Sequence, residues 1–440
     1  MTKLWQKPFD SAQGKPSTKL HPLIETYTVG DGVSFDQVLL PYDILASAAH
    51  AEGLKNIGIL SAAELAKLKA GLNKLKKLYE QGKVLVTVAD EDCHTVIENF
   101  LVEELGDVGK KIHSGRSRND QVLVAVRLYL LDQLGKTQKE VAQTARDFLS
   151  FAKKHQNVPM PGYTHTQQAM LSSVGHWAAS FVEALLDDCA VIGGVMGHVS
   201  KNPLGSAAGF GVSLPLDREL TTKKLGLLMT QTNSLYCQAS RGKFESVVLE
   251  ALVQVMLTLG KFAQDLLLFT SQEFAFFSAD DSLTTGSSIM PQKKNHDALE
   301  ILRGKVSKVI SHQHFVQDLC KNLISGYHRD LQLINAALMD SFAIVQGSLA
   351  VAQLYLKHLK PNQKEMEKKI TKEIFAADVA NELVKSKGIP FRDAYLQAME
   401  RLDEQEFDLQ KNLKSKISLG APGNLNLKGY ETRLKSFPLH

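Results

Sequence analysis

The chain has 440 residues, more than one simple core usually holds, so two or three domains or one long assembly are expected. Apolar residues make up 44% and charged residues 22%, a balance that excludes disordered, collagen-like and low-complexity proteins. Lysine and arginine total 51 against 47 acidic residues, and a net charge of +4 on so long a chain argues against a nucleic-acid-binding protein.

The amino terminus, MTKLWQKPFDSAQGK, lacks the apolar core of a signal peptide. The most apolar stretch, residues 251–260, is far shorter than the ~20 residues that a membrane span needs. The four cysteines show no C-x-x-C spacing, which argues against a zinc site or a disulfide framework. We therefore expect a cytoplasmic protein that binds no membrane.

Long helices are predicted through the middle of the chain. Prolines, which cost a helix interior ~3 kcal/mol, are absent from most of it. The first predicted helix is Asp120–His155, and the second is Leu171–Met196, where small residues such as Gly175 would let another backbone approach. The third is Phe244–Phe269, in which apolar residues recur every three or four positions. The longest alternating, strand-like pattern is only Val84–Val88.

These patterns predict an all-α fold, a long-helix bundle with smaller helical domains at both ends. We expect an N-terminal mainly helical domain over residues 1–112, a central bundle over 113–360 and a small C-terminal helical domain over 361–440. Helices this long expose more apolar surface than one chain can easily cover, which predicts self-association.

Two polar segments precede the first two long helices. The segment HSGRSRNDQ contains Ser117 and Asn119, which suit a helix N-cap, beside two arginines at a helix end that favours anions. It is either a solvated cap or an anion site. The segment PMPGYTHTQQ contains Thr164, which could bind a carboxylate, and His165, which could move a proton near neutral pH. A lone histidine is more often structural, but a break between two long helices favours a functional role.

A third polar segment, residues 284–300, contains a hydroxyl-rich stretch around Ser287 and then Pro291, which suits the first turn of the next helix. Lys293 and Asn295 crowd the same place, and several donors aimed at one point suit a carboxylate or an oxyanion. The spacing is not that of a P-loop. The pair His312-x-His314 has no matching ligand cluster, so no metal site is expected.

The third segment reads GSSIMPQKKN, which fits the G-S-x-x-M-x-x-K-x-N signature of the fumarase/aspartase superfamily throughout. Within that superfamily the chain most closely resembles the argininosuccinate lyase family. The blocks that carry this resemblance follow the family's order, over residues 4–402, and read EDCHTVIE, HSGRSRNDQV, PGYTHTQQA, YHRDLQ and KGIPFRDAY.

The resemblance implies a homotetramer with each active site assembled from three subunits. The reaction would split argininosuccinate into arginine and fumarate, a step of arginine biosynthesis, with no metal and no cofactor. The implied partners are a small-molecule substrate and other copies of the chain, with no nucleic acid and no membrane.

The resemblance also implies roles for single residues. Ser287 would be the base, His165 the other catalytic residue and Glu300 the acid that orients it. Lys293 and Asn295 would surround the carboxylate whose charge grows as the neighbouring proton leaves. The implied substrate-binding positions are Ser117, Asn119 and Thr164 for the succinyl carboxylates, and Asp92, Tyr327 and Gln332 for the arginine half.

The chain departs from the family pattern mainly on the arginine side. The family's Y-N-[KR]-D-L-Q-E-D-K reads YHRDLQLIN here, which puts Asn335 in place of a substrate-binding lysine, and Arg329 could compensate. Gly32 stands where the family has a serine that contacts substrate. His296 replaces a common proline, and the G-G-R-F block is absent after Leu4. None of these changes removes an elimination residue.

Three other functions remain open from the sequence. One is a sister lyase of the superfamily, such as adenylosuccinate lyase, although HSGRSRND does not resemble that family. Another is a non-catalytic structural homologue, as in lens crystallins derived from this family. The last is a nucleic-acid-binding helical protein, supported only by the run KKIHSGRSR.

Overall fold

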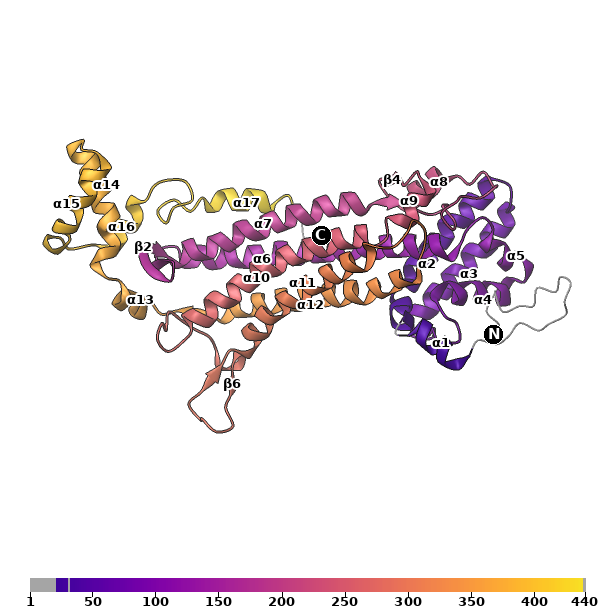
Figure 1. The fold of residues 1–440 in the computed structure, drawn as a ribbon, viewed down its shortest axis with the longest axis horizontal. Coiled ribbons are helices and arrows are strands. Elements are labelled where there is room, and N and C mark those ends of the chain that lie inside the picture. Colours follow the sequence, from indigo (N-terminus) through magenta and orange to yellow (C-terminus); the bar gives the residue numbers. More distant parts are fainter. Residues whose placement is uncertain (1–20, 31, 438–440) are drawn as a thin grey trace. The chain divides into compact units, whose positions relative to one another are not determined.

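The computed structural model describes residues 21–30 and 32–437, so the departure after Leu4 lies outside the described residues. The predicted all-α fold of long helices is confirmed (Figure 1). The chain forms two compact units, each built from three separate segments. Of the described residues, those within 1–136, 193–250 and 311–342 form unit 1, and those within 137–192, 251–310 and 343–440 form unit 2.

Five long helices contribute residues to both units: α6 (Arg118–Lys154), α7 (Val174–Val199), α10 (Lys243–Phe269), α11 (Asp297–Cys320) and α12 (Ile334–His358). The predicted helices Asp120–His155 and Phe244–Phe269 are confirmed as α6 and α10, and no end differs by more than two residues. The predicted close approach is confirmed at Gly175 of α7, where a Cβ atom would lie 2.4 Å from Gln156 Cα.

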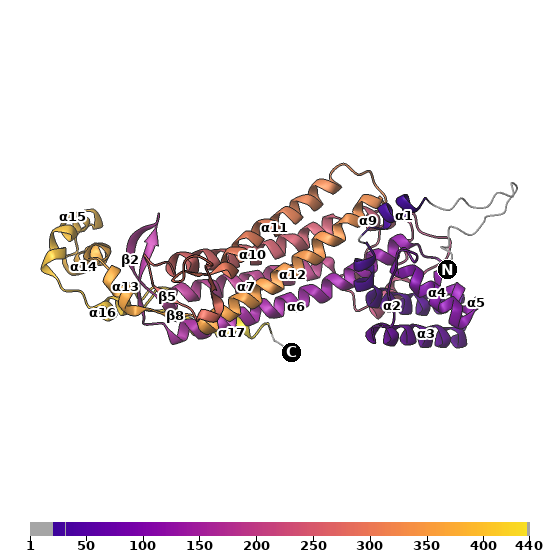
Figure 2. The ribbon, with the colours of Figure 1, turned by 90° about the horizontal axis from the view of Figure 1, so that it is seen from below.

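Unit 1 contains a group of helices in which α2 (Gly32–Asn56) packs against α3 (Ala62–Glu80) and α4 (Cys93–Leu105) (Figures 1 and 2). Helix α3 begins with a capping box between Ser61 and Glu64, and buries Leu68, Leu72 and Leu75 along one face. The other elements confined to unit 1 are α1 (Pro22–Val29), α5 (Asp107–Lys110), β3 (Lys201–Asn202), α8 (Arg218–Lys224), β4 (Met229–Thr230) and α9 (Ser234–Ala239), with 3-10 turns at Lys111–His113 and Arg329–Leu333.

Unit 2 combines long-helix segments with three small hairpins or strand pairs and a C-terminal group of helices. Its strands are β1 (Pro159–Thr164), β2 (Gln167–Ser173), β5 (Phe277–Ser278), β6 (Thr285–Gly286), β7 (Lys294–Asn295) and β8 (Lys360–Pro361), paired β1–β2, β5–β8 and β6–β7, all antiparallel. Its short helices are α13 (Gln363–Lys369), α14 (Ala376–Lys387), α15 (Phe391–Arg401), α16 (Leu409–Ser415) and α17 (Leu427–Leu434), with 3-10 turns at Asp281–Leu283, Lys372–Phe375 and Leu402–Glu404.

The strands lie away from Val84–Val88, the longest alternating pattern in the sequence, which is not a strand. Instead, β1 and β2 form a hairpin at Pro159–Ser173 that no alternating pattern indicated. The predicted second helix therefore begins at Val174 rather than Leu171, because residues 171–173 pair with β1.

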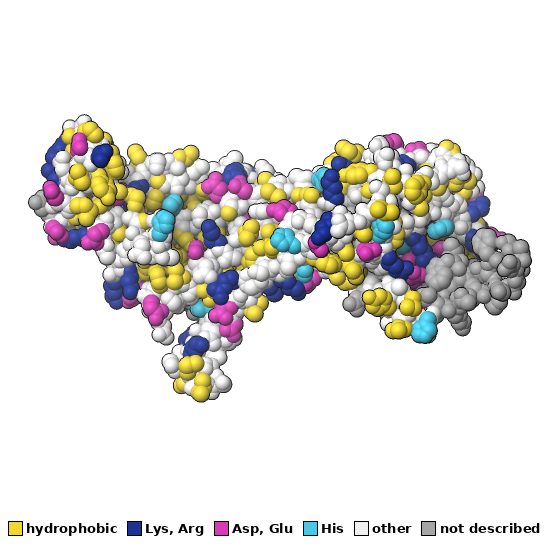
Figure 3. All heavy atoms as spheres, viewed as in Figure 1, with side chains coloured by type: hydrophobic (Ala, Val, Ile, Leu, Met, Phe, Trp, Pro, Cys, Tyr) yellow, Lys and Arg dark blue, Asp and Glu magenta, His cyan; other side chains and the backbone are white. Residues whose placement is uncertain are grey.

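The tail beyond the family resemblance is folded. Helix α17 packs on α6 and α7 of unit 2, where the Tyr430 hydroxyl donates to Glu183 at 3.0 Å and Arg433 donates to Asp187 at 2.7 Å. Tyr430 and Leu434 are buried. Hydrophobic side chains are also exposed on the segment that carries α15 (Figure 3), including Leu396, which is 67% exposed.

Two stretches, Ser234–Phe269 and Arg329–His358, are long and apolar enough to cross a membrane by length and composition. In each, 56% of the most apolar window is buried inside the protein. Core helices of soluble proteins have the same properties.

A buried ion pair in unit 1 makes stability depend on pH. His94 Nδ1 lies 2.6 Å from Asp43 Oδ2, and the side chains are 4% and 0% exposed. Burial alone would lower the pKa of His94, but the Asp43 carboxylate raises it to about 9. Because this pKa is above the ordinary value of ~6.5, the stabilisation is complete below pH ~6.5 and is lost as pH rises through about 9.

We therefore expect the thermal unfolding temperature to decrease as the pH is raised from ~6.5 to ~9.5. Calorimetry at fixed protein concentration measures this decrease. A His94→Gln variant should be less stable at pH 6.5 and show a flatter profile over this range. If the unfolding temperatures of the unmodified protein and of His94→Gln change with pH in the same way, His94 is not charged in the folded protein.

Candidate active site

His165 lies at the turn of the β1–β2 hairpin. Thr164 pairs with Gln167, so the loop has two residues, His165 and Thr166, with φ of +52° and +61°. Two positive φ values are typical of a type I′ hairpin turn, which most often uses asparagine and glycine. Thr164 and His165 are both exposed. The hairpin thus presents a hydroxyl and an imidazole together at its end.

Ser287 lies in a second hairpin of unit 2, in the loop between β6 and β7, which projects from the start of α11 (Figure 1). Its Oγ accepts hydrogen bonds from the backbone N–H of Ile289 at 3.3 Å and of Met290 at 3.1 Å. Donors aimed at a hydroxyl oxygen favour its deprotonated form. The loop itself therefore supplies two N–H donors to the Ser287 oxygen.

Lys293, Asn295 and Glu300 follow Ser287 on the same segment. Lys293 is exposed at the end of the loop, and Asn295 is half-buried on β7, paired with Thr285. Glu300 is exposed in the first turn of α11. Among the described residues of unit 2, no hydrogen bond joins Glu300 to His165.

The predicted helix start at Pro291 was wrong. Pro291 lies in the loop, and α11 begins only at Asp297. The pairing of β6 with β7 and the bond from Thr285 Oγ1 to Asp297 Oδ2 at 2.5 Å close the hairpin instead. The imidazole of His296, where the family commonly has proline, lies 3.3 Å from the Tyr355 hydroxyl, and burial lowers its pKa.

In unit 1, Ser117 and Asn119 form the start of α6. Ser117 Oγ accepts the Asn119 N–H at 3.3 Å, and Asp120 accepts the Ser117 N–H at 2.9 Å. Two backbone N–H groups at the start of the helix therefore have side-chain acceptors. Asp120 is fully buried and also accepts N–H bonds from the loop at Gly205 and Ala207. This carboxylate fixes the orientation of the helix end that carries the two predicted binding residues.

Asp92 already has several partners. One carboxylate oxygen caps α4 by accepting Thr95 N–H and Oγ1–H at 2.8 Å, and the other accepts Arg118 Nη1 at 3.0 Å. Arg118 also lies 3.6 Å from Glu91, whose backbone has φ of +74°. An incoming ammonium group would share Asp92 with Arg118.

The residues predicted for the arginine half lie in one part of unit 1. Arg329 pairs with Glu91 at 3.3 Å and donates to the Thr28 carbonyl at 3.2 Å. Gln332 lies so close to Gly32 that a Cβ atom at residue 32 would be 2.8 Å from its Nε2. Asn335, which replaces the family's lysine, is only 7% exposed. The structure thus brings the departures Gly32 and Asn335 into the same region as Gln332.

Sequence reasoning missed Arg241. Its guanidinium lies over the Tyr327 ring at 5.4 Å, and the residue is 6% exposed. A buried arginine against an aromatic face restricts the ring's position. No motif pointed to it, because the contact joins residues far apart in the sequence.

One group of possible metal ligands exists among the described residues. Asp36, Cys93 and His94 place their ligand atoms within 4.8 Å of one another, and all three are buried. His94 Nδ1 is already bonded to Asp43 at 2.6 Å. This group is better explained as the buried ion pair with its neighbours than as a metal centre.

Known proteins resemble this chain over most of its length. A family model described as "Lyase" matches residues 20–311. Argininosuccinate lyase from Xanthomonas campestris pv. campestris (strain B100) is 42% identical over 426 residues, covering 96% of both chains. The chain belongs to the argininosuccinate lyase family. A member from Sorangium cellulosum (strain So ce56) is 44% identical, covering 93% of this chain and 95% of that protein.

Solved structures share the fold of the family at lower identity. EDDS lyase in complex with formate has a TM-score of 0.79 with 22% identity, covering 96% of this chain and 91% of that one. The 3-carboxy-cis,cis-muconate lactonizing enzyme from Pseudomonas putida has a TM-score of 0.68 with 16% identity, covering 95% of this chain and all of that one. These likenesses concern the fold alone.

Proposed function

We propose that this protein cleaves argininosuccinate to arginine and fumarate. The observation that carries the proposal is Ser287 Oγ held by two backbone N–H groups inside an unbroken GSSIMPQKKN signature. The family relatives named as argininosuccinate lyases, matched over nearly the whole chain, support the choice of substrate.

The proposed reaction is a general acid/base elimination. Ser287, as the alkoxide, removes the proton from the carbon next to a carboxylate, and the electron pair spreads into that carboxylate as an aci-carboxylate. Lys293 and Asn295 stabilise the added negative charge. The carbon–nitrogen bond then breaks, and His165, oriented by Glu300, supplies a proton to the departing guanidino nitrogen.

The proposed substrate contacts fall into two groups. Ser117, Asn119 and Thr164 bind the succinyl carboxylates through hydroxyl and amide groups. Asp92, Tyr327, Gln332 and Arg329 bind the arginine half. Arg329, which also pairs with Glu91 at 3.3 Å, compensates in this proposal for the lysine that Asn335 replaces.

A homotetramer in the cytoplasm, acting in arginine biosynthesis, completes the proposal. Each active site would take segments from three subunits. Each chain would comprise three domains, over residues 1–112, 113–360 and 361–440. Light scattering should then give about four times the chain mass of 48.5 kDa.

The deciding experiment follows fumarate absorbance with purified protein and argininosuccinate. Adenylosuccinate and aspartate are tested in parallel, since a sister lyase would prefer one of them. Turnover of argininosuccinate alone is the expected result. No turnover of any of the three would favour the non-catalytic structural homologue.

A further inference from the structure

The hairpin that carries His165 cannot be ordered by its own two strands. A two-stranded hairpin is at best marginally stable in water. Its turn also places two non-glycine residues, His165 and Thr166, at positive φ, which adds backbone strain. The position of the imidazole must therefore be fixed by contacts outside the hairpin.

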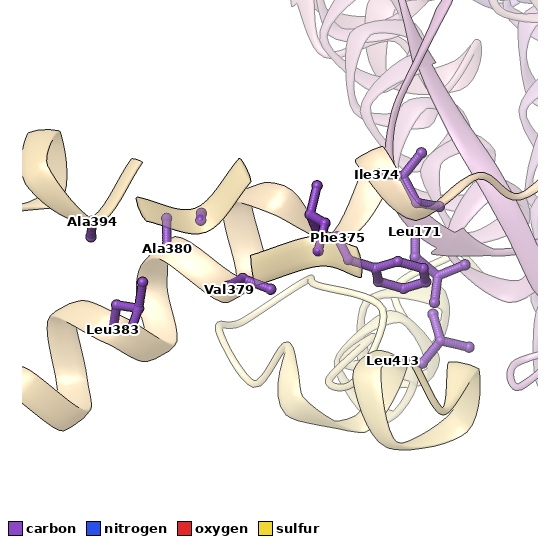
Figure 4. Packing of buried hydrophobic residues seen from close by; sticks show 10 residues of the cluster. Leu171, Ile374, Phe375, Val379, Ala380, Leu383, Ala394 and Leu413 are labelled. Carbon is purple, nitrogen blue, oxygen red and sulfur yellow. The ribbon is translucent and has the colours of Figure 1, made fainter. Parts of the chain in front are cut away.

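One such contact is hydrophobic. Leu171 of β2 is 1% exposed and belongs to a cluster whose other buried members all come from the C-terminal segment of unit 2. Figure 4 shows Leu171 beside Ile374, Phe375 and Leu413. The Leu171 side chain thus anchors β2 to the C-terminal helices.

A second contact is polar and more specific. The Lys416 ammonium donates to the Leu171 carbonyl at 2.9 Å and to Asn412 Oδ1 at 2.9 Å, and it pairs with Asp378 Oδ2 at 3.1 Å. Asn412 also donates to Asp378 at 2.9 Å. The Lys416 side chain is only 13% exposed. All three ammonium protons therefore have acceptors, one of which is the backbone of β2.

Further contacts from the same segment reach β2 and the residues just before β1. Gln168 Nε2 donates to the Lys369 carbonyl at 2.5 Å. Gln410 Nε2 donates to the carbonyl of Asn157, just before β1, at 2.9 Å. Of these contacts, only the one from Lys416 places a charged group directly on the backbone of a hairpin strand.

We infer that Lys416 is a positioning residue for catalysis. Its ammonium bonds to Asp378, Asn412 and the Leu171 carbonyl and so fixes β2 against the C-terminal segment. This contact fixes the position of the hairpin turn and therefore of His165. The inference rests on the proposed catalytic role of His165. Misplacing a reacting group by about 1 Å can cost ~10²-fold in rate, so a single lost anchor should be measurable.

The kinetic test compares Lys416→Met, which removes the charge, with Lys416→Arg, which keeps charge and donors. The methionine variant is expected to lose kcat by about 10- to 100-fold with KM changed less than about threefold. The arginine variant should recover most of the loss. The matched control is Lys414→Met, an exposed lysine on α16, which should keep the kcat of the unmodified enzyme.

A second measurement does not depend on turnover. Hydrogen–deuterium exchange, followed by mass spectrometry on the full-length enzyme, is expected to show faster exchange over residues 159–173 in Lys416→Met than in Lys416→Arg or Lys414→Met. Peptides from unit 1 should exchange equally in all of them. Equal exchange over residues 159–173 in every variant would overturn the positioning role.

The two measurements separate the two proposals. Faster hairpin exchange with an unchanged kcat would also overturn the inference, because His165 would then not depend on the anchor. If the unmodified enzyme fails to cleave argininosuccinate, the proposed function is wrong, while the exchange comparison still decides whether Lys416 orders the hairpin.

Discussion

Replacing Ser287 by alanine is expected to lower kcat by about 10³-fold, within the range for removal of a general base. The variant loses the oxygen that accepts the N–H groups of Ile289 and Met290. It keeps the rest of the loop, including Lys293 and Asn295, so the KM for argininosuccinate should change little. Fumarate absorbance under saturating substrate measures the loss.

The matched control is Ser282→Ala, which removes an exposed hydroxyl from the same unit outside the β6–β7 hairpin. Its kcat should equal that of the unmodified protein. A Ser287→Ala enzyme that retained more than about a tenth of the activity would assign proton removal to another residue.

Replacing Asp43 by asparagine should cause the largest loss of stability. The change leaves His94 buried without its anionic partner, and breaking a buried pair in this way typically costs about 3–5 kcal/mol. Asp43 also lies near Arg116, whose buried guanidinium donates to Ser47 at 2.9 Å. Urea denaturation at pH 6.5, followed by circular dichroism at fixed protein concentration, measures the difference.

The control for Asp43→Asn is Asp107→Asn, which makes the same charge change at a side chain that is 91% exposed. Its denaturation midpoint should hardly move, since exposed pairs such as Asp107–Lys110 contribute little. Equal midpoints for the two variants would show that the buried pair contributes no more than a surface one.

The long helices were predictable because their evidence is local and repeated. In Phe244–Phe269 the apolar positions recur with the helical period over seven turns, and no proline interrupts them. The same reasoning located α6. The start of α7 was placed too early because serine, glycine and leucine at residues 171–175 are compatible with either a strand end or a helix.

The hairpins were not predictable by the same reasoning. Pro159 and Pro161 argue against a strand, and the turn between β1 and β2 uses His165 and Thr166 in place of the usual asparagine and glycine. The strands β6 and β7 have two residues each, too few for any alternating pattern. Contacts with the rest of unit 2, such as those at Leu171, stabilise structures that the local sequence disfavours.

The sequence and its resemblance predict which residues form the candidate site, but not how those residues are bonded. The signature indicated Ser287, yet only the loop geometry supplies its two N–H donors. The resemblance assigned Asp92 to the substrate's ammonium group, whereas its roles as a helix cap and as a partner of Arg118 depend on long-range packing.

The two-residue turn at the end of the β1–β2 hairpin limits which amino acids residue 165 can accommodate. A backbone φ of +52° is tolerated by histidine and asparagine much better than by most other side chains. Asparagine is therefore the informative replacement, since it removes the imidazole and keeps the loop. A β-branched residue would change the chemistry and the chain path together, so its inactivity would not reveal which of the two mattered.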